Sequence, residues 1–232
     1  MATTVKTTDE RVNDIFFGPL ERPALHWLCA QMPPWVNPDM LTTIGVLGGL
    51  IVALGYWLSN VNRNYLWLVD FGLAVNWFGD SLDGSLARYR QCERFQYGYF
   101  VDHTVDTLTQ TIICLGLGLS PFIGFNYALL ILVGYLQLGI LTFVHSLVTG
   151  ISKISYGKIG PTEIRFLIVG ANLVFYCATN PLLHWSFLTI SLFNLLALGI
   201  ALIFFVYFMV FAFMHARELS RQDPRKNKIF VP

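Results

Sequence analysis

Four aspartates between residues 80 and 106 are spaced so that helices would bring their carboxylates together. A helix places relative positions 0, +3, +4, +7 and +8 on one face, and these positions hold Asp80, Asp83, Gly84, Ala87 and Arg88. A second stripe repeats every four residues and consists of Gly98, Asp102 and Asp106. The largely polar residues 89–97 predict a turn between two antiparallel helices. Counting outward from this turn at about 1.5 Å per residue, all four carboxylates are expected to converge.

Such a cluster in an apolar chain needs compensation, because each ionised carboxylate costs about 3 kcal/mol in a membrane. Protonation or bound divalent cations could supply it. Since no His or Cys stands at ligand spacing, carboxylates alone favour Mg²⁺ or Mn²⁺ over zinc. Two such ions would bring the charge near zero, and a pair about 4 Å apart stabilises the attacking and leaving oxygens of phosphoryl transfer. The spacing therefore indicates a two-ion site that handles phosphate.

The other residues of the two stripes allow two interpretations. Small side chains leave room for a ligand between backbones, or they serve close packing of helices: Gly84, Ala87 and Gly98. Arg88 could form a bidentate phosphate contact, or it is an interfacial arginine. Asn76 and Thr109 extend the stripes and could support the carboxylates or join helices. His103 points about 100° away from Asp102 along a helix, which favours an inter-helix polar contact over metal ligation.

Composition places the chain in a membrane, because 55% of its 232 residues are hydrophobic and 12% are charged, against about 25% charged residues in soluble domains. We expect an all-α integral membrane protein. Hydropathy predicts six transmembrane helices, at about 40–59, 65–88, 97–119, 122–148, 163–180 and 186–215. The formal net charge of +1 gives no basis for nucleic-acid binding.

Basic residues orient these spans. Fourteen of the fifteen lysines and arginines fall before the first span, after the last, or in alternate connections, and Arg63 alone falls on the opposite side. The positive-inside rule therefore puts both termini and the 80–106 segment at the cytoplasmic side. We expect a single membrane domain over residues 1–232, with a cytoplasmic or interfacial segment 1–36, a six-helix bundle 40–215 and a cytoplasmic tail 216–232.

The segment before the first span is too polar to cross a membrane. Residues 9–32 mix aromatic and aliphatic side chains with acids and arginines, and Pro19 and Pro23 interrupt them. This composition favours an N-terminal amphipathic surface helix, and a packed N-terminal cap is the alternative. Asn37 and Pro38 then form a helix-start signal as N-cap and first helical residue.

The eight stripe positions together resemble the signature of the CDP-alcohol phosphotransferases, also called CDP-alcohol phosphatidyltransferases. The six-span layout with a preceding surface helix resembles this family too. The resemblance implies transfer of a substituted phosphate from a CDP-alcohol to an acceptor hydroxyl with release of CMP, in phospholipid synthesis, and a homodimer. It also implies that Asp80, Asp83 and Asp102 hold metal and diphosphate and that Asp106, at the same metals, is the general base. The nucleotide and its diphosphate would lie against Asp80, Asp83, Gly84, Ala87, Arg88 and Gly98.

Two features depart from the family pattern. The turn between Arg88 and Gly98 has nine residues where eight or fewer are usual. Many members have Pro-Asn-x-x-Thr before the first span, and here the stretch is Pro38-Asp39-Met40-Leu41-Thr42.

Two branches of the family differ in which substrate is the lipid. The segment 102–106 resembles the Asp-His-x-x-Asp of choline and ethanolamine phosphotransferases, and residues 160–163, Gly-Pro-Thr-Glu, resemble a stretch in that branch. These matches favour a soluble CDP-alcohol donor and a lipid acceptor. The alternative is a CDP-diacylglycerol donor with an inositol phosphate, glycerol phosphate or serine acceptor, whose phosphate could meet Lys153, Lys158 and Arg165; these residues equally suit positive-inside topology. A remote alternative is a cation transporter, since membrane carboxylates also conduct ions.

Overall fold

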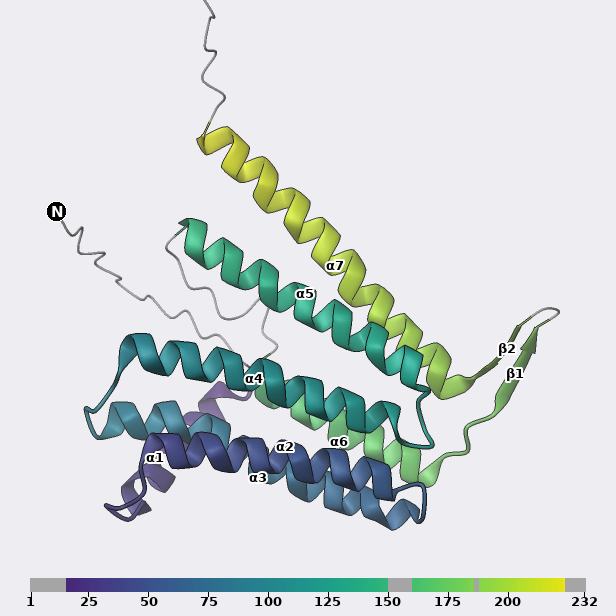
Figure 1. The fold of residues 1–232 in the computed structure, drawn as a ribbon, viewed down its shortest axis with the longest axis horizontal. Coiled ribbons are helices and arrows are strands. Elements are labelled where there is room, and N and C mark those ends of the chain that lie inside the picture. Colours follow the sequence, from purple (N-terminus) through teal and green to yellow (C-terminus); the bar gives the residue numbers. More distant parts are fainter. Residues whose placement is uncertain (1–15, 150–159, 186–187, 224–232) are drawn as a thin grey trace, which may run out of the picture.

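The computed structural model describes residues 16–149, 160–185 and 188–223. Within these ranges the chain is mostly helical (Figure 1), in the order α1 (Gly18–Gln31), α2 (Pro38–Leu58), η1 (Arg63–Tyr65), α3 (Leu66–Tyr89), α4 (Phe95–Gly118), α5 (Phe125–Thr149), α6 (Pro161–Cys177), β1 (Leu182–Trp185), β2 (Leu188–Ser191) and α7 (Leu192–Gln222). Helices α2 to α6 coincide closely with five of the predicted spans.

Helix α2 is the centre of the part that carries the aspartates. It packs against both α3 and α4, more extensively than α3 and α4 pack against one another. Glycines allow this contact, because a Cβ on Gly79 would lie 2.2 Å from the Gly45 nitrogen and one on Gly48 would lie 2.3 Å from the Asn76 nitrogen. Small residues at such positions let helix backbones touch in a membrane. Close packing of the helices therefore depends on glycines such as Gly45, Gly48 and Gly79, which lie outside the two aspartate stripes.

The start of α2 follows the predicted signal. Asn37 caps the helix, since its Oδ1 accepts a 2.9 Å hydrogen bond from the Met40 nitrogen, and Pro38 occupies the first turn.

The turn between α3 and α4 is shorter than the nine residues expected, because α3 continues to Tyr89 and α4 already begins at Phe95. Gln91 takes a left-handed conformation there, with φ of 53°. Arg90 ties the turn to the segment before α2 through hydrogen bonds to the carbonyls of Val36, Pro33 and Met32.

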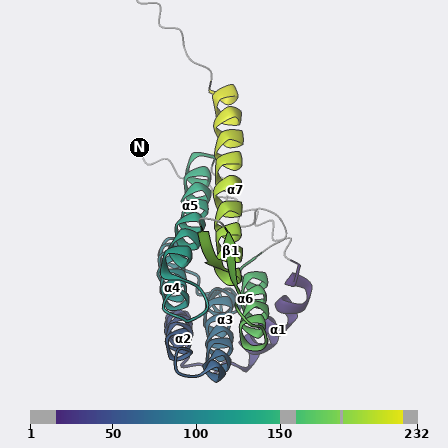
Figure 2. The same ribbon diagram turned by 90° about the vertical axis from the view of Figure 1, so that its right-hand side faces the viewer.

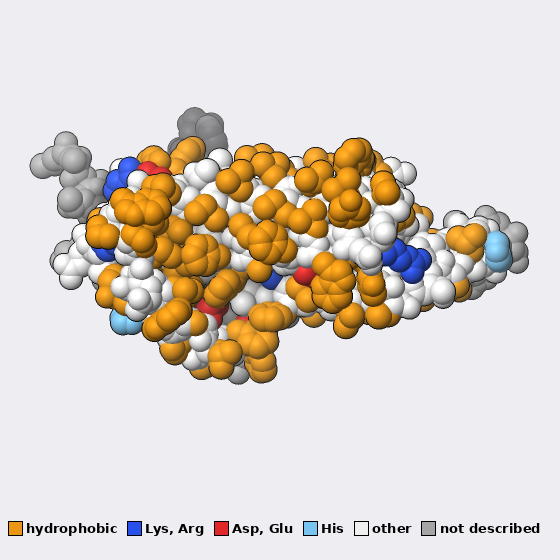
Figure 3. All heavy atoms as spheres, turned by 90° about the horizontal axis from the view of Figure 1, so that it is seen from below, with side chains coloured by type: hydrophobic (Ala, Val, Ile, Leu, Met, Phe, Trp, Pro, Cys, Tyr) orange, Lys and Arg blue, Asp and Glu red, His pale blue; other side chains and the backbone are white. Residues whose placement is uncertain are grey.

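The surface is that of a membrane protein. Three of the described helices, α2, α5 and α7, are long and apolar enough to cross a bilayer. Helices α3 and α4 carry the aspartates, and α6 has 17 residues, so the count of six spans stays a prediction. The face drawn in Figure 3 is covered largely by hydrophobic side chains, with few charged ones among them. An apolar surface of this extent suits lipid contact.

The last helix differs from its predicted range of 186–215. It begins at Leu192 because the preceding residues form a hairpin, in which Leu182 pairs with Ser191 and Trp185 with Leu188. Ser191 then caps the helix through a 3.3 Å hydrogen bond from the Asn194 nitrogen. The helix continues to Gln222. It packs along α5, and Figure 1 shows this pair diverging from α2, α3 and α4.

Helix α1 lies beside α3 and α6 (Figure 2). Its Cys29 is buried in a cluster with Leu82 and Leu86 of α3. On its other side Leu20 and Trp27 are 77% and 62% exposed. The helix is thus packed against the bundle as in the N-terminal cap interpretation, while its exposed apolar side is the one that a membrane surface would meet.

Candidate active site

Three of the four aspartates meet in one cluster. Asp80 comes from the middle of α3, and Asp102 and Asp106 come from successive turns of α4. One carboxylate oxygen from each lies within 4.8 Å of the other two, and all three residues are partly buried. This is the close approach that a metal ion requires of its ligands, and oxygen-only donors suit a hard divalent cation.

Asp83 lines the same pocket but stands apart from the cluster. Its Oδ2 accepts a 2.6 Å hydrogen bond from the Thr42 hydroxyl of α2. The pocket lies between α2, α3 and α4 and is lined by Thr42, Gly45, Asn76, Asp80, Asp83, Asp102, Val105, Asp106 and Thr109. All four aspartates therefore face one pocket, to which α2 contributes Thr42 and Gly45.

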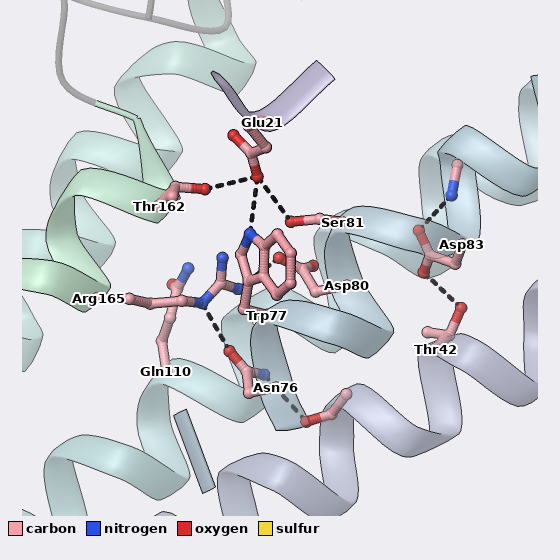
Figure 4. Close-up of polar contacts among 12 residues, drawn as sticks. Glu21, Thr42, Asn76, Trp77, Asp80, Ser81, Asp83, Gln110, Thr162 and Arg165 are labelled. Carbon is pink, nitrogen blue, oxygen red and sulfur yellow. Dashed lines mark hydrogen bonds and ion pairs between the residues drawn. The ribbon is translucent and has the colours of Figure 1, made fainter. Parts of the chain in front are cut away.

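Arg165 of α6 extends to Asp80 of the cluster and to Asn76 (Figure 4). It forms an ion pair with Asp80 through Nη2, and its Nε donates a 2.9 Å hydrogen bond to Oδ1 of Asn76. The arginine and Asp80 side chains are only 15% and 19% exposed. Nη1 of Arg165 is buried and has no hydrogen-bond partner among the described residues. Of the three predicted acceptor cations, Arg165 therefore lies at the carboxylates, while Lys153 and Lys158 lie outside the described residues.

Asn76 links Arg165 to helix α2. Its Nδ2 donates a 2.9 Å hydrogen bond to the carbonyl of Gly45, and only 6% of the residue is exposed. Both alternatives proposed for Asn76 apply, since it joins α2 to α3 and also supports Arg165.

The remaining stripe residues lie nearer the turn and do not line this pocket. The side chain of Arg88 folds back over Gly84, where a Cβ would be 3.3 Å from Arg88 Nη1. Ala87 is partly buried beside them. A Cβ on Gly98 would meet no atom of the described residues within 4 Å. The pocket that the carboxylates line therefore does not extend to these four residues, and Gly98 lies on the exposed surface.

Asp39, which stands where many family members have asparagine, pairs with the turn. Both of its carboxylate oxygens lie 2.6 Å from Nη2 of Arg94, and the guanidinium sits 3.9 Å from the centre of the Tyr97 ring. The hydrogen bond from Arg94 to Asp39 raises the pKa of the guanidinium. This position therefore clamps the start of α2 to the start of α4.

His103 contacts both a carboxylate and another helix. Its Nδ1 lies 3.1 Å from Oδ2 of Asp102, and its ring packs 4.1 Å from the Tyr99 ring and 5.0 Å from that of Phe143 on α5. His103 thus contacts α5 by ring packing, whereas the polar contact of its imidazole is with Asp102 of its own helix and not with another helix as predicted.

Comparison with known families bears on this geometry. The profile described as CDP-alcohol phosphatidyltransferase matches residues 35–207, a range that contains all four aspartates and Arg165. The chain belongs to the CDP-alcohol phosphatidyltransferase family. This family membership confirms the resemblance read from the stripe spacing, and members of this family are transferases.

Curated relatives of this phosphatidyltransferase family member come from both branches. The chain is 28% identical over 159 residues to cholinephosphotransferase 1 of Danio rerio, covering 62% of this chain and 39% of that protein. It is 33% identical over 99 residues to archaetidylinositol phosphate synthase of Pyrococcus horikoshii, covering 43% and 50%. It is 33% identical over 84 residues to phosphatidylinositol phosphate synthase of Cutibacterium acnes, covering 36% and 38%. The chain spans half or less of the length of these relatives.

Two contributors to the site of this family member did not follow from helical spacing. Thr42 ends the Pro38-Asp39-Met40-Leu41-Thr42 stretch, which resembles the family's Pro-Asn-x-x-Thr, but this stretch does not identify Thr42 as the partner of Asp83. Glu21 lies in the N-terminal segment and hydrogen-bonds to Ser81, the neighbour of Asp80. Both contacts join residues far apart in sequence, so the spacing of neighbouring residues does not predict them.

Proposed function

We propose that this protein transfers a substituted phosphate group from a CDP-alcohol to the hydroxyl of an acceptor alcohol and releases CMP. The observation that carries the proposal is the convergence of Asp80, Asp102 and Asp106 in a pocket that Asp83 also lines. One substrate is a lipid, as the largely apolar face in Figure 3 and the products named in two relatives suggest.

The four aspartates hold two divalent ions, Mg²⁺ or Mn²⁺. Three carboxylates within 4.8 Å of each other, without a nitrogen or sulfur donor among them, suit oxygen-preferring cations. When bound, such ions supply charge stabilisation to the diphosphate and to the oxygens that attack and leave.

Asp106 is the general base. In the transfer step the acceptor oxygen bonds to the phosphorus that carries the donor's alcohol, the bond from that phosphorus to CMP breaks, and the acceptor proton passes to the Asp106 carboxylate. A carboxylate can take this proton when it is within hydrogen-bond reach of the hydroxyl. The family resemblance assigns this role to Asp106, and its place beside Asp80 and Asp102 in the cluster supports the assignment.

The nucleotide and diphosphate lie along the stripes toward the turn. Asp80 and Asp83 meet the diphosphate, and Gly84, Ala87, Arg88 and Gly98 line the remaining space. Two observations support this placement: a Cβ on Gly98 would meet no described atom within 4 Å, and the nearest group over Gly84 is the guanidinium of Arg88. Arg88 is exposed at this end, where its guanidinium can turn toward a phosphate.

The donor is a soluble CDP-alcohol of the CDP-choline or CDP-ethanolamine type, and the acceptor is a lipid. Two observations support this choice. The Asp102-His103 pair, with the imidazole 3.1 Å from the carboxylate, belongs to the pattern that resembles this branch. Among the relatives described above, the longest aligned stretch is with a cholinephosphotransferase.

A second candidate is transfer from CDP-diacylglycerol to a phosphorylated polar alcohol such as an inositol phosphate. Arg165 favours it, because a buried guanidinium beside the carboxylates, with Nη1 unpartnered among the described residues, is suited to an acceptor phosphate. Two relatives are named as inositol phosphate synthases. Lys153 and Lys158 would then complete the acceptor site.

The bundle crosses the membrane six times, with both termini and the active site at the cytoplasmic side. The distribution of basic residues supports this orientation. Helix α1 lies at the membrane surface with Leu20 and Trp27 toward the lipid, which their exposure supports. The protein works as a homodimer, an expectation that comes from the family resemblance.

Incubation of the purified protein in lipid micelles with each donor separately tests the function. CDP-diacylglycerol, CDP-choline, CDP-ethanolamine and a CDP-inositol are each offered with lipid and polar acceptors, and CMP is measured. We expect release with one donor class in Mg²⁺ or Mn²⁺, complete loss in excess chelator, and recovery on adding either ion back. Absence of CMP release from every donor would rule out the proposed reaction, and undiminished release in chelator would rule out the metal site.

Replacing Thr42 with valine is expected to lower kcat/KM about tenfold. The Thr42 hydroxyl holds Asp83 by a 2.6 Å hydrogen bond, and a hydrogen bond to a charged group is worth about 1.5–3 kcal/mol. Thr43→Val is the matched control, because the exposed Thr43 hydroxyl donates its hydrogen bond to the Asp39 carbonyl of its own helix. Initial rates of CMP release measure both variants, and equal rates for the two would show that Thr42 does not position Asp83.

A further inference from the structure

Glu21 of α1 joins three helices beside the active site. Its Oε1 accepts hydrogen bonds from Trp77 Nε1 at 2.8 Å and from Ser81 Oγ at 3.2 Å, both on α3. The same oxygen accepts a 2.8 Å hydrogen bond from Thr162 Oγ1 at the start of α6 (Figure 4). A single carboxylate oxygen is therefore the common acceptor of α3 and α6.

The donors to Glu21 are sequence neighbours of the site residues. On α3, Trp77 and Ser81 directly follow Asn76 and Asp80. On α6, Thr162 precedes Arg165 by three residues, which is one helical turn. Because Asn76 and Asp80 are the partners of Arg165, two adjacent sets of polar contacts join α3 to α6. In one set Arg165 binds directly to α3, and in the other Glu21 accepts hydrogen bonds from both helices.

The start of α6 is held by α1 a second time. Glu163, which is 8% exposed, accepts hydrogen bonds from the Phe17 nitrogen at 2.9 Å and from the Gly160 nitrogen at 2.8 Å. The Phe17 ring also packs 4.8 Å from that of Phe166. Thus the Glu21 carboxylate of α1 accepts a hydrogen bond from α6, and the Glu163 carboxylate of α6 accepts one from Phe17, just before α1. Both contacts involve the Gly-Pro-Thr-Glu stretch at residues 160–163.

We infer that Glu21 is a positioning residue that sets Arg165 against Asp80 by fixing the first turn of α6, an inference that rests on the proposed function. Removing Glu21 leaves three donors without their acceptor and frees that turn from α3. Buried polar groups without partners are costly, so the helices shift to find new ones. Displacement of a charged side chain by about 1 Å at a reacting centre can cost on the order of 100-fold in rate.

The test compares Glu21→Ala and Thr162→Val, which remove the acceptor and one of its donors, with Thr162→Ser, which keeps the donor. Glu93→Ala in the exposed α3–α4 turn is the matched control for removing an acid. We expect kcat per folded molecule to fall about tenfold or more in Glu21→Ala and severalfold in Thr162→Val. The KM for the donor should change less than about twofold, and Thr162→Ser and Glu93→Ala should resemble the wild type.

A second measurement does not depend on activity. Hydrogen–deuterium exchange of the backbone amides in residues 163–167 should accelerate in Glu21→Ala and Thr162→Val but not in Glu93→Ala. If kcat per folded molecule stays within about twofold of the wild type in both variants, Glu21 has only a structural role and the inference is wrong, while the proposed function stands. If the wild type itself releases no CMP, the proposed function is wrong. Separately, unchanged hydrogen–deuterium exchange in Glu21→Ala and Thr162→Val would show that Glu21 does not fix the first turn of α6.

Discussion

Replacing Asp106 with asparagine is expected to lower CMP release by about 1,000-fold or more while the protein folds normally. Asparagine has nearly the same size as aspartate and keeps one oxygen for a metal ion, but it cannot accept the proton of the incoming hydroxyl. General-base catalysis contributes about 100- to 10,000-fold in enzymes. The measurement is single-turnover release of CMP from the donor identified in the screen, at saturating Mg²⁺.

Two controls make the Asp106 result specific. Asp223→Asn makes the same chemical change at the exposed end of α7, and it should keep the wild-type rate. Calorimetric titration with Mn²⁺ should show that Asp106→Asn still binds metal, with an affinity reduced far less than the rate. A near-normal rate for Asp106→Asn would remove Asp106 as the base and would direct attention to the other carboxylates of the cluster.

Adding a single methyl group at Gly79 is expected to separate α2 from α3 and to destabilise the fold. The Cβ of Gly79→Ala would lie 2.2 Å from the Gly45 nitrogen and 2.5 Å from the Leu41 carbonyl oxygen. Both are backbone atoms, so no side chain can turn aside. Overpacking of this kind costs about 1–3 kcal/mol. Because Gly79 directly precedes Asp80, the metal-ligand cluster should also be displaced and activity should fall with stability.

Gly170→Ala on α6 is the matched control for Gly79. A Cβ there would meet no described atom within 4 Å, and alanine is favoured over glycine inside a helix by about 1 kcal/mol. Thermal unfolding in detergent should therefore show a lower Tm for Gly79→Ala and an unchanged or higher Tm for Gly170→Ala. Equal Tm values for Gly79→Ala and the wild type would mean that α2 and α3 are not held in backbone contact.

The cluster of carboxylates could be read from the sequence because it depends on local geometry. Residues three and four apart share a helical face whatever the rest of the fold does. The spacing from Asp80 to Asp106 therefore predicted which aspartates face one another across the turn. The separation of Asp83 from the other three could not be predicted in this way, since it follows from a hydrogen bond to Thr42 on another helix.

Hydropathy located the helices better than it located their ends. The predicted last span began at residue 186, yet residues 188–191 pair with residues 182–185 as strands and α7 starts only at Leu192. A short apolar run carries no periodicity that separates a strand from a helix. Similarly, residues 89–97 have turn composition, but both helices extend into them. Arg90 hydrogen-bonds to the segment before α2 and Arg94 pairs with Asp39 in the first turn of α2, contacts that composition does not reveal.

The sequence by itself determined the family and the apolar helical architecture, and it predicted that aspartates of the 80–106 segment converge. It could do so because helical periodicity and composition are properties of neighbouring residues. Only the tertiary structure decided that α2 packs between the helices that carry the aspartates, that Arg165 pairs with Asp80, and that Glu21 ties α1 to α3 and α6. The contacts of Arg165 and Glu21 join residues more than 50 positions apart. All of these contacts depend on which helix faces pack together, a choice that hydropathy leaves open.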